Sequence, residues 1–438
     1  MIDRVSCDDL LSLASEHGGA AMQLGAVVVL DTSGGFDPVA LEREIRVRSQ
    51  RVPRLDQPLV TVPWGCGRPV WSESARVWGQ GQVETVPCPE PRGDEGLLAL
   101  AAELVCRPLP RERPLWRAVV VTGVEVDRAA VVLVLHHVLA DGVSALAILS
   151  ALTDPRSPDQ VEAPTPLRPR AFPSWGQLVA DSLRDRRARL RGLTTSTRRL
   201  RTALRVLRSS GETHAAPSSL NQVTGRRRRF AVVDVDLGSL SRAAHAHAVT
   251  MNDVLLLAVA SALHDLLAAR GEQVDALVLS MLVSEQRQTG SARLGNHSGV
   301  VAVTVATVGE PAGLLRAVGR TTRAAKALPA GASTAVLAPL FRALASTGLL
   351  RFYTMRQHRI HTFVSNLRGP ESTLTLGGCP VTRILPLSPG SGNVTVSFSA
   401  LSYAGRLAVS ICADPDTCPD LPSLASGLHD RLTTLGAA

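Results

Sequence analysis

The chain has 438 residues with a formal net charge of +9, and 45% of them are hydrophobic although only 3% are aromatic. This length allows two domains with filled cores, and leucine, valine and alanine must supply most of the core volume. No apolar run reaches the roughly 18 residues of a transmembrane helix, and the acidic first residues do not resemble a signal peptide. We therefore expect a globular cytoplasmic protein.

In the first part of the chain, β-branched apolar runs predict strands at 26–30, 118–121 and 131–135. The last of these runs ends at His136 and His137. An Asp-Gly pair follows four residues after the second histidine, and the segment 143–152 has the apolar spacing of a helix. The segment 131–152 is therefore predicted to form a strand, a turn and a helix, with two imidazoles at the end of the strand.

Histidine has an unperturbed pKa near physiological pH, so a histidine held at a strand end suits proton abstraction. His137 is our candidate catalytic base, and we expect supporting roles for His136 and Asp141. Asp141 is placed to accept backbone N–H groups at the helix start, and Gly142 tolerates a tight backbone path. The alternative is that both histidines are ordinary strand-end residues satisfied by their neighbours.

A proline-rich stretch over 154–173 indicates a boundary, and a strongly basic segment follows it. Arg184–Arg229 contains fourteen arginines and two acids, so the rest of the chain is net negative. Spaced leucines predict a basic amphipathic helix, which is either a solvated face or a contact with an anionic membrane or lipid droplet. Nucleic acid is not expected, because no aromatic stacking platform accompanies the arginines. Lys326 is the only lysine, a bias typical of GC-rich genomes such as those of actinobacteria.

The second half again mixes strands and helices. The predicted strands cover 230–236, 276–283, 300–308, 362–365, 394–399 and 407–411, and the predicted helices cover 252–269, 312–327 and 335–350. Asn252 and Asp253 open the first of these helices. Asn252 is a candidate oxyanion donor or substrate positioner and Asp253 a residue that fixes the helix start, although both could simply form an N-cap pair. We divide the chain into an N-terminal subdomain (1–165), a Pro- then Arg-rich helical crossover (166–228) and a C-terminal subdomain (229–438).

Other cofactor and nucleophile signatures are absent from the sequence. The seven cysteines form no Cys-x-x-Cys and have no histidine at zinc spacing, so we expect reduced thiols and no metal. There is no phosphate-binding glycine motif and no Gly-x-Ser-x-Gly elbow. We expect no cofactor and no covalent acyl-enzyme.

The pattern His-His-x3-Asp-Gly is the signature of an acyltransferase superfamily. Its members include chloramphenicol acetyltransferase, peptide-synthetase condensation domains and the bacterial wax ester synthase/diacylglycerol acyltransferases. The chain resembles the last family nearly end to end, in the order of its motifs. The matching segments are Asp9 to Gly25, Pro114-Leu115-Trp116, Asn252-Asp253, Leu294-Gly295-Asn296, Val364 to Pro370, Ser402-Tyr403 and Ala413-Asp414-Pro415.

The resemblance implies an α/β (α+β) fold of two chloramphenicol-acetyltransferase-like subdomains in a V, with the active-site channel between them. It implies O-acyl transfer from an acyl-CoA thioester, used as substrate, to a hydroxyl such as that of a fatty alcohol or diacylglycerol. His137 would be the general base. Trp116, Asn296 and Asn366, like Asp253, would bind substrate or support the site.

Two departures from the family bear on the substrate. The segment 282–287 reads Leu-Val-Ser-Glu-Gln-Arg, without the family's proline and with Arg287 displaced by one place, and Arg368 replaces a small or apolar residue. One alternative is therefore a specialised-metabolite acyltransferase or condensation-type enzyme that takes a polyketide or peptide acyl group from CoA or an acyl carrier protein. A catalytically silent lipid-binding homologue is another, and the intact histidine motif argues against it.

Overall fold

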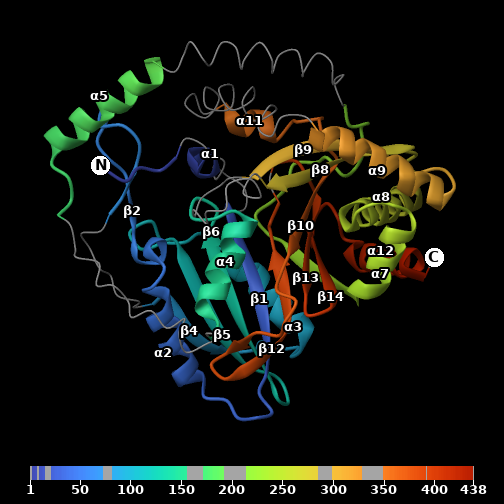
Figure 1. Cartoon of the computed structure of the whole chain (residues 1–438), viewed down its shortest axis with the longest axis horizontal. Helices are drawn as coiled ribbons and strands as arrows, with labels where there is room; N and C mark the ends of the chain where they lie inside the picture. The colour runs from blue at the N-terminus through green and yellow to red at the C-terminus, as the bar shows by residue number, and fades with distance from the viewer. Residues whose placement is uncertain are drawn as a thin grey trace.

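The computed structural model describes residues 2–6, 9–14, 21–72, 81–154, 171–191, 214–284, 298–327, 349–390 and 392–437. Within these residues the strands form two six-stranded sheets and one two-stranded sheet. Figure 1 shows the two large sheets next to each other, with a group of helices on the far side of the second sheet.

The first sheet has the strand order β11-β12-β1-β6-β5-β4. Its strands are β1 (Gln23–Asp31), β4 (Val83–Pro87), β5 (Trp116–Glu125), β6 (Arg128–His136), β11 (Thr375–Leu376) and β12 (Cys379–Leu387). Every residue of β6 from Ala129 to His136 is buried, because successive side chains point to opposite faces and both faces are covered. The helices α2 (Pro38–Ser49), α3 (Asp94–Cys106) and α4 (Gly142–Leu152) contribute to the same apolar core.

Two strands of this first sheet come from the C-terminal half of the chain. β12 pairs with β1 in antiparallel fashion, and β11 pairs with the outer side of β12. The expected C-terminal subdomain of residues 229–438 therefore needs a correction, since residues 375–387 complete the first sheet. Arg383 of β12 ties the halves together, because its Nη1 donates to Asp94 of α3 at 2.8 Å and it also pairs with Asp234 of the second sheet.

The second sheet has the order β7-β14-β13-β10-β8-β9. Its strands are β7 (Arg229–Asp236), β8 (Ala276–Ser284), β9 (Ser298–Ala306), β10 (Thr362–Arg368), β13 (Val396–Tyr403) and β14 (Arg406–Ala413). β10 runs parallel to both of its neighbours, and the other pairs are antiparallel. The helices around this sheet are α7 (Leu237–Ala246), α8 (Met251–Ala269), α9 (Pro311–Ala327) and α12 (Leu421–Ala437).

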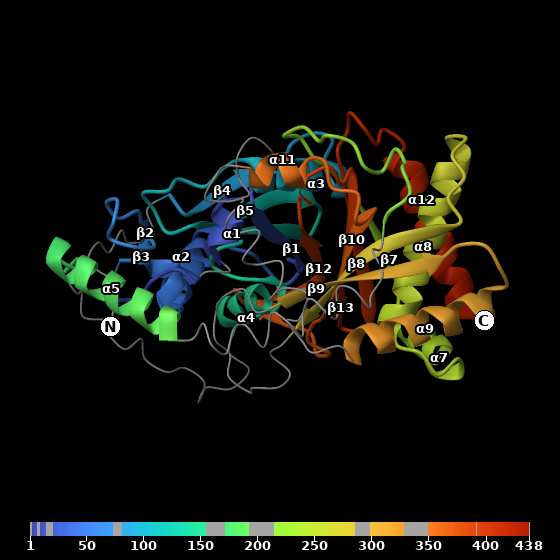
Figure 2. The same ribbon diagram turned by 90° about the horizontal axis from the view of Figure 1, so that it is seen from above.

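The two faces of the second sheet belong to different cores. On β13, Phe398 packs into the core shared with α8 and α12, whereas Leu401 and Tyr403 pack into the core of the first sheet. The Tyr403 hydroxyl accepts from the N–H of Leu374 at 2.7 Å and donates to the carbonyl of Val381 at 2.9 Å. The second sheet is thus held between its own helices and the first half of the molecule (Figure 2).

The remaining described elements are not part of the two large sheets or of the helices named above. They are α1 (Asp9–Ala14), the 3-10 turn η1 (Pro53–Asp56), β2 (Leu59–Val60), β3 (Val70–Trp71), α5 (Trp175–Arg191) and α11 (Leu350–Thr354). Leu178 of α5 packs with Cys66 and Val70, so this helix is seated on the β2–β3 hairpin. Figures 1 and 2 place α5 at the outer edge of the molecule.

Most predicted elements in the described residues are confirmed. β1, β5, β6, β7, β8, β9, β10, β13, β14, α4, α8 and α9 all overlap their expected ranges. The expected helix 335–350 lies outside the described residues except for its last two. Residues 155–170 of the proline-rich boundary and 192–213 of the predicted crossover also lie outside them. Among the described helices, α8 has the length and hydropathy to cross a membrane. However, 67% of its apolar 18-residue stretch is buried, as expected of a core helix. The six described cysteines are all free.

Candidate active site

The two histidines at the end of β6 have different surroundings. The side chain of His136 is 1% exposed, and its Nδ1 accepts a hydrogen bond from the N–H of Val138 at 2.9 Å. Its backbone N–H donates to the carbonyl of Leu115 at 2.9 Å. An imidazole whose Nδ1 accepts from the main chain fixes the turn, so the structure supports the predicted accessory role of His136.

His137 is the first residue beyond the strand. Its backbone N–H donates to the carbonyl of Met22 at 2.9 Å, so its main chain is anchored to the start of β1. The side chain is half-buried, and the residues that flank it on both sides, His136 and Val138, are buried. Of the two histidines, His137 is therefore the more exposed, and its role as general base stays a prediction.

Asp141 ends the turn and caps α4. Its Oδ1 accepts from the N–H of Ser144 at 2.9 Å, and its backbone carbonyl accepts from Ala145 at 2.8 Å. The carboxylate is almost fully buried, at 3% exposure. The predicted capping role is confirmed. The turn from His137 to Asp141, hereafter the histidine turn, is consequently held at one end by the start of β1 and at the other end by α4.

The second half of the chain reaches this turn through β10. Leu367 of β10 lies against Gly142, the first residue of α4, at the junction of the two halves. Its neighbour Asn366 is half-buried and stands in register with Ala400 of β13. Because strand side chains alternate, Asn366 points to the face opposite Leu367, and we place no direct contact between Asn366 and the histidine turn.

Asn252 and Asp253 occupy the first turn of α8. Thr250 is the N-cap, and a capping box is complete because Thr250 Oγ1 accepts from the N–H of Asp253 while the Asp253 carboxylate accepts from the N–H of Thr250. Asp253 is fully buried and also accepts from Thr322 Oγ1 at 2.6 Å. The predicted role of Asp253 at the helix start is confirmed.

Asn252 is directed to a neighbour within the second half. Its Nδ2 donates to the sulfur of Met281 on β8 at 3.5 Å. None of the described contacts joins Asn252 to the first half, so its role as oxyanion donor or substrate positioner stays a prediction.

Of the other residues singled out in the sequence, two are described by the structure and two are not. Trp116 is 2% exposed and its Nε1 donates to the carbonyl of Leu55 at 2.7 Å, so it is a structural residue of β5. Arg368 is exposed and pairs with Glu371. Asn296 and the displaced Arg287 lie outside the described residues.

Sequence reasoning missed several supporting residues. Gln23 is buried, and its amide joins β1 to the end of α3 through Val105 O at 2.6 Å, Arg107 O at 3.0 Å and Leu109 N at 2.9 Å. The capping box at Thr250 could have been found from its Thr-x-x-Asp spacing. The contact between Leu367 and Gly142 has no local signal in either segment. No cluster of three potential metal ligands occurs among the described residues.

The fold places a half-buried histidine directly after a strand of the first of two six-stranded sheets. The sequence signature of the wax ester synthase/diacylglycerol acyltransferase catalytic domain matches residues 5–255, and that of the family's C-terminal domain matches residues 294–436. The chain belongs to the wax ester synthase/diacylglycerol acyltransferase family. This confirms the family expected from the sequence.

Individual relatives agree with this assignment. A Mycobacterium tuberculosis (strain H37Rv) protein named as a diacylglycerol O-acyltransferase is 28% identical over 463 residues, covering 99% of this chain and 98% of that protein. Another from the same strain, similarly named, is 28% identical over 436 residues, covering 95% and 92%.

Solved structures confirm the two-subdomain, chloramphenicol-acetyltransferase-like fold. The wax ester synthase/diacylglycerol acyltransferase from Marinobacter aquaeolei VT8 has a TM-score of 0.71 at 22% identity, covering 99% of this chain and 98% of that one. The first condensation domain of the calcium-dependent antibiotic synthetase has a TM-score of 0.65 at 17% identity, covering 100% and 97%.

Proposed function

We propose that the protein transfers an acyl group from an acyl-CoA thioester to the hydroxyl of a fatty alcohol or diacylglycerol. Family membership supports this substrate class. The observation that carries the proposal is the position of His137. It is half-buried directly after β6, one of the two middle strands of the first sheet, in a turn whose following helix is contacted by Leu367 of the second half.

The reaction follows from this placement of a base. The imidazole of His137 removes the hydroxyl proton as the alcohol oxygen attacks the thioester carbonyl, which forms a new carbon–oxygen bond and an oxyanion. The oxyanion collapses, the carbon–sulfur bond breaks, and the thiolate of CoA takes the proton from the imidazolium. The products are an ester and free CoA. Both substrates bind together, so no acyl-enzyme and no cofactor are required.

A direct assay tests the donor and the acceptor. Labelled palmitoyl-CoA is incubated with the full-length protein and either hexadecanol or diolein, and the ester products and released thiol are quantified. We expect ester formation with release of one thiol per ester. Turnover only with an acyl group on a carrier-protein arm would replace CoA as the donor, and turnover of only a polyketide or peptide thioester would replace the lipid substrates. The absence of ester with every one of these donors would contradict the proposal.

We also propose that α5 holds the protein at an anionic lipid surface. The two acids of this helix face inward, where Asp181 pairs with Arg4 at 2.8 Å and Asp185 with Arg68 at 3.1 Å. The outer side carries Trp175 and Leu183, which are 67% and 47% exposed, together with the exposed Arg184, Arg186 and Arg187. An outward face of arginines and apolar side chains suits the headgroup region of an anionic membrane or lipid inclusion.

Reversing the charge of this face should weaken lipid binding. The variant Arg184→Glu/Arg186→Glu/Arg187→Glu should lose flotation with vesicles of phosphatidylcholine mixed with phosphatidylglycerol, since each cation contributes about 1 kcal/mol near such a surface. The matched control is Arg316→Glu/Arg320→Glu/Arg323→Glu on α9, three arginines that are also exposed. Equal flotation of both variants and the unmodified protein would contradict the proposal, as would equal flotation with pure phosphatidylcholine.

A further inference from the structure

The glycine of the histidine motif, Gly142, is not explained by its own backbone. It is the first residue of α4, directly after the cap residue Asp141. It is not among the glycines with positive φ, so its conformation is one that any residue can adopt. Alanine would even be favoured at a helical position on grounds of intrinsic propensity. The need for glycine must therefore come from a neighbour.

That neighbour is Leu367 of the second half. A Cβ on Gly142 would lie 2.9 Å from Leu367 Cδ1 and 3.2 Å from Cδ2, which is closer than carbon atoms normally approach. The three atoms nearest to such a Cβ all belong to the side chain of Leu367. Leu367 itself is half-buried and packs against the core of the first sheet. The missing side chain of Gly142 is the space that Leu367 fills.

The strand that carries Leu367 has little freedom to move away. β10 is paired with β13 from Val364 to Arg368, which includes Leu367, and with β8 from Thr362 to Val364. Just beyond its end, the N–H of Gly369 donates to the carbonyl of Ser402 at 2.8 Å, and a Cβ on Gly369 would come within 2.5 Å of the same oxygen. A larger side chain at position 142 must therefore displace the Leu367 side chain or the first turn of α4.

We infer that Gly142 and Leu367 are positioning residues that set the distance between the histidine turn and the second half. Asp141 joins the first turn of α4 to the end of the turn that begins at His137. A shift at Gly142 is consequently transmitted to His137, while residues remote from this contact are unaffected. This inference rests on the proposed role of His137 as the base.

A double-mutant cycle tests the contact. Gly142→Ala should lower kcat by about tenfold or more, because small misplacements of a catalytic group are costly, with a much smaller change in KM for the thioester. Leu367→Ala in the same chain removes the obstructing methyl groups and should restore most of the lost kcat. The control is Gly427→Ala in α12, where an added Cβ has no atom within 4 Å, and its kcat should equal that of the unmodified protein.

The Tm of the same variants, measured without any substrate, tests the contact between Gly142 and Leu367 independently of catalysis. Gly142→Ala should lower Tm, and adding Leu367→Ala should bring a smaller further loss than Leu367→Ala causes alone. Additive effects of the two substitutions on kcat would overturn the inference, as would a Gly142→Ala variant with unchanged kcat. His137→Ala assayed in parallel separates the two proposals. Turnover retained without His137 refutes the base, whereas an unrescued Gly142→Ala refutes only the positioning contact.

Discussion

Replacing His137 by alanine should lower the rate of acyl transfer by about 10²- to 10⁴-fold, the usual contribution of a general base. The half-buried side chain follows the end of β6, and its main chain is anchored by the N–H bond to Met22. That backbone bond survives the substitution, so we expect the turn to keep its main-chain path and the circular dichroism spectrum to stay unchanged. The measurement is kcat for ester formation from palmitoyl-CoA under saturating acceptor.

The adjacent histidine provides the contrast. His136→Ala removes the acceptor for the N–H of Val138 in a buried site, which should cost about 1–3 kcal/mol of folding free energy. Loss of activity in His136→Ala would thus come with a lower Tm, so kcat and Tm are measured together for both histidine variants. A His137→Ala protein with the kcat of the unmodified chain would refute the mechanism.

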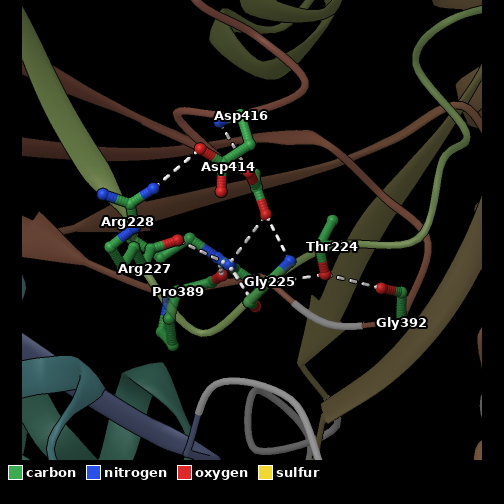
Figure 3. A network of polar contacts seen from close by, with 8 residues as sticks. All are labelled: Thr224, Gly225, Arg227, Arg228, Pro389, Gly392, Asp414 and Asp416. Atoms are coloured by element: carbon green, nitrogen blue, oxygen red, sulfur yellow. Dashed lines mark hydrogen bonds and ion pairs between the residues drawn. The ribbon is translucent and has the colours of Figure 1, made fainter.

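Replacing Arg228 by leucine should lower the free energy of unfolding by about 3–5 kcal/mol, because it leaves a buried carboxylate without its cation. The side chains of Arg228 and Asp414 are 3% and 1% exposed and form an ion pair at 3.5 Å. The guanidinium also donates to the carbonyls of Pro389 at 2.6 Å and Gly225 at 2.9 Å (Figure 3). These bonds join the entry to β7, the end of β14 and the loop after β12.

The next residue along the chain is a matched control. Arg227 pairs with Asp416 at 2.7 Å, but the two side chains are 74% and 62% exposed. Arg227→Leu should therefore change stability by less than about 1 kcal/mol. Urea unfolding followed by circular dichroism gives both values. Similar losses for the two variants would mean that the buried network adds nothing beyond a surface ion pair.

Much of the candidate site could be predicted because its signals are local. A continuous apolar run that ends at two histidines predicts a buried strand with imidazoles at its end, and β6 follows this pattern. Asp141 lies three residues before Ser144, the spacing at which a carboxylate caps a helix, and that bond is present. Asp253 at the start of α8 follows the same local logic.

The misses have a common cause, which is that the relevant partner lies far away in the chain. β12 was not predicted, and its pairing with β1 moves residues 375–387 into the first sheet. The alternation of a strand does not say which sheet it will join, since any exposed edge offers the same backbone groups. Likewise, the helix start of Asn252 was predicted, but its direction toward Met281 depends on how α8 packs on β8.

The family, the strand-end histidines, the Asp141 cap of α4 and the many arginines before the second half can all be read from the amino-acid sequence alone. Periodicity, capping and motif spacing depend on residues within a few positions of one another, so they can be recognised in the sequence without the structure. The folded chain was needed to show that β12 completes the first sheet and that Leu367 fills the space left by Gly142. It also showed that Arg228 and Asp414, 186 positions apart, share one buried network. Such contacts depend on the packing of two cores, and no local pattern encodes that packing.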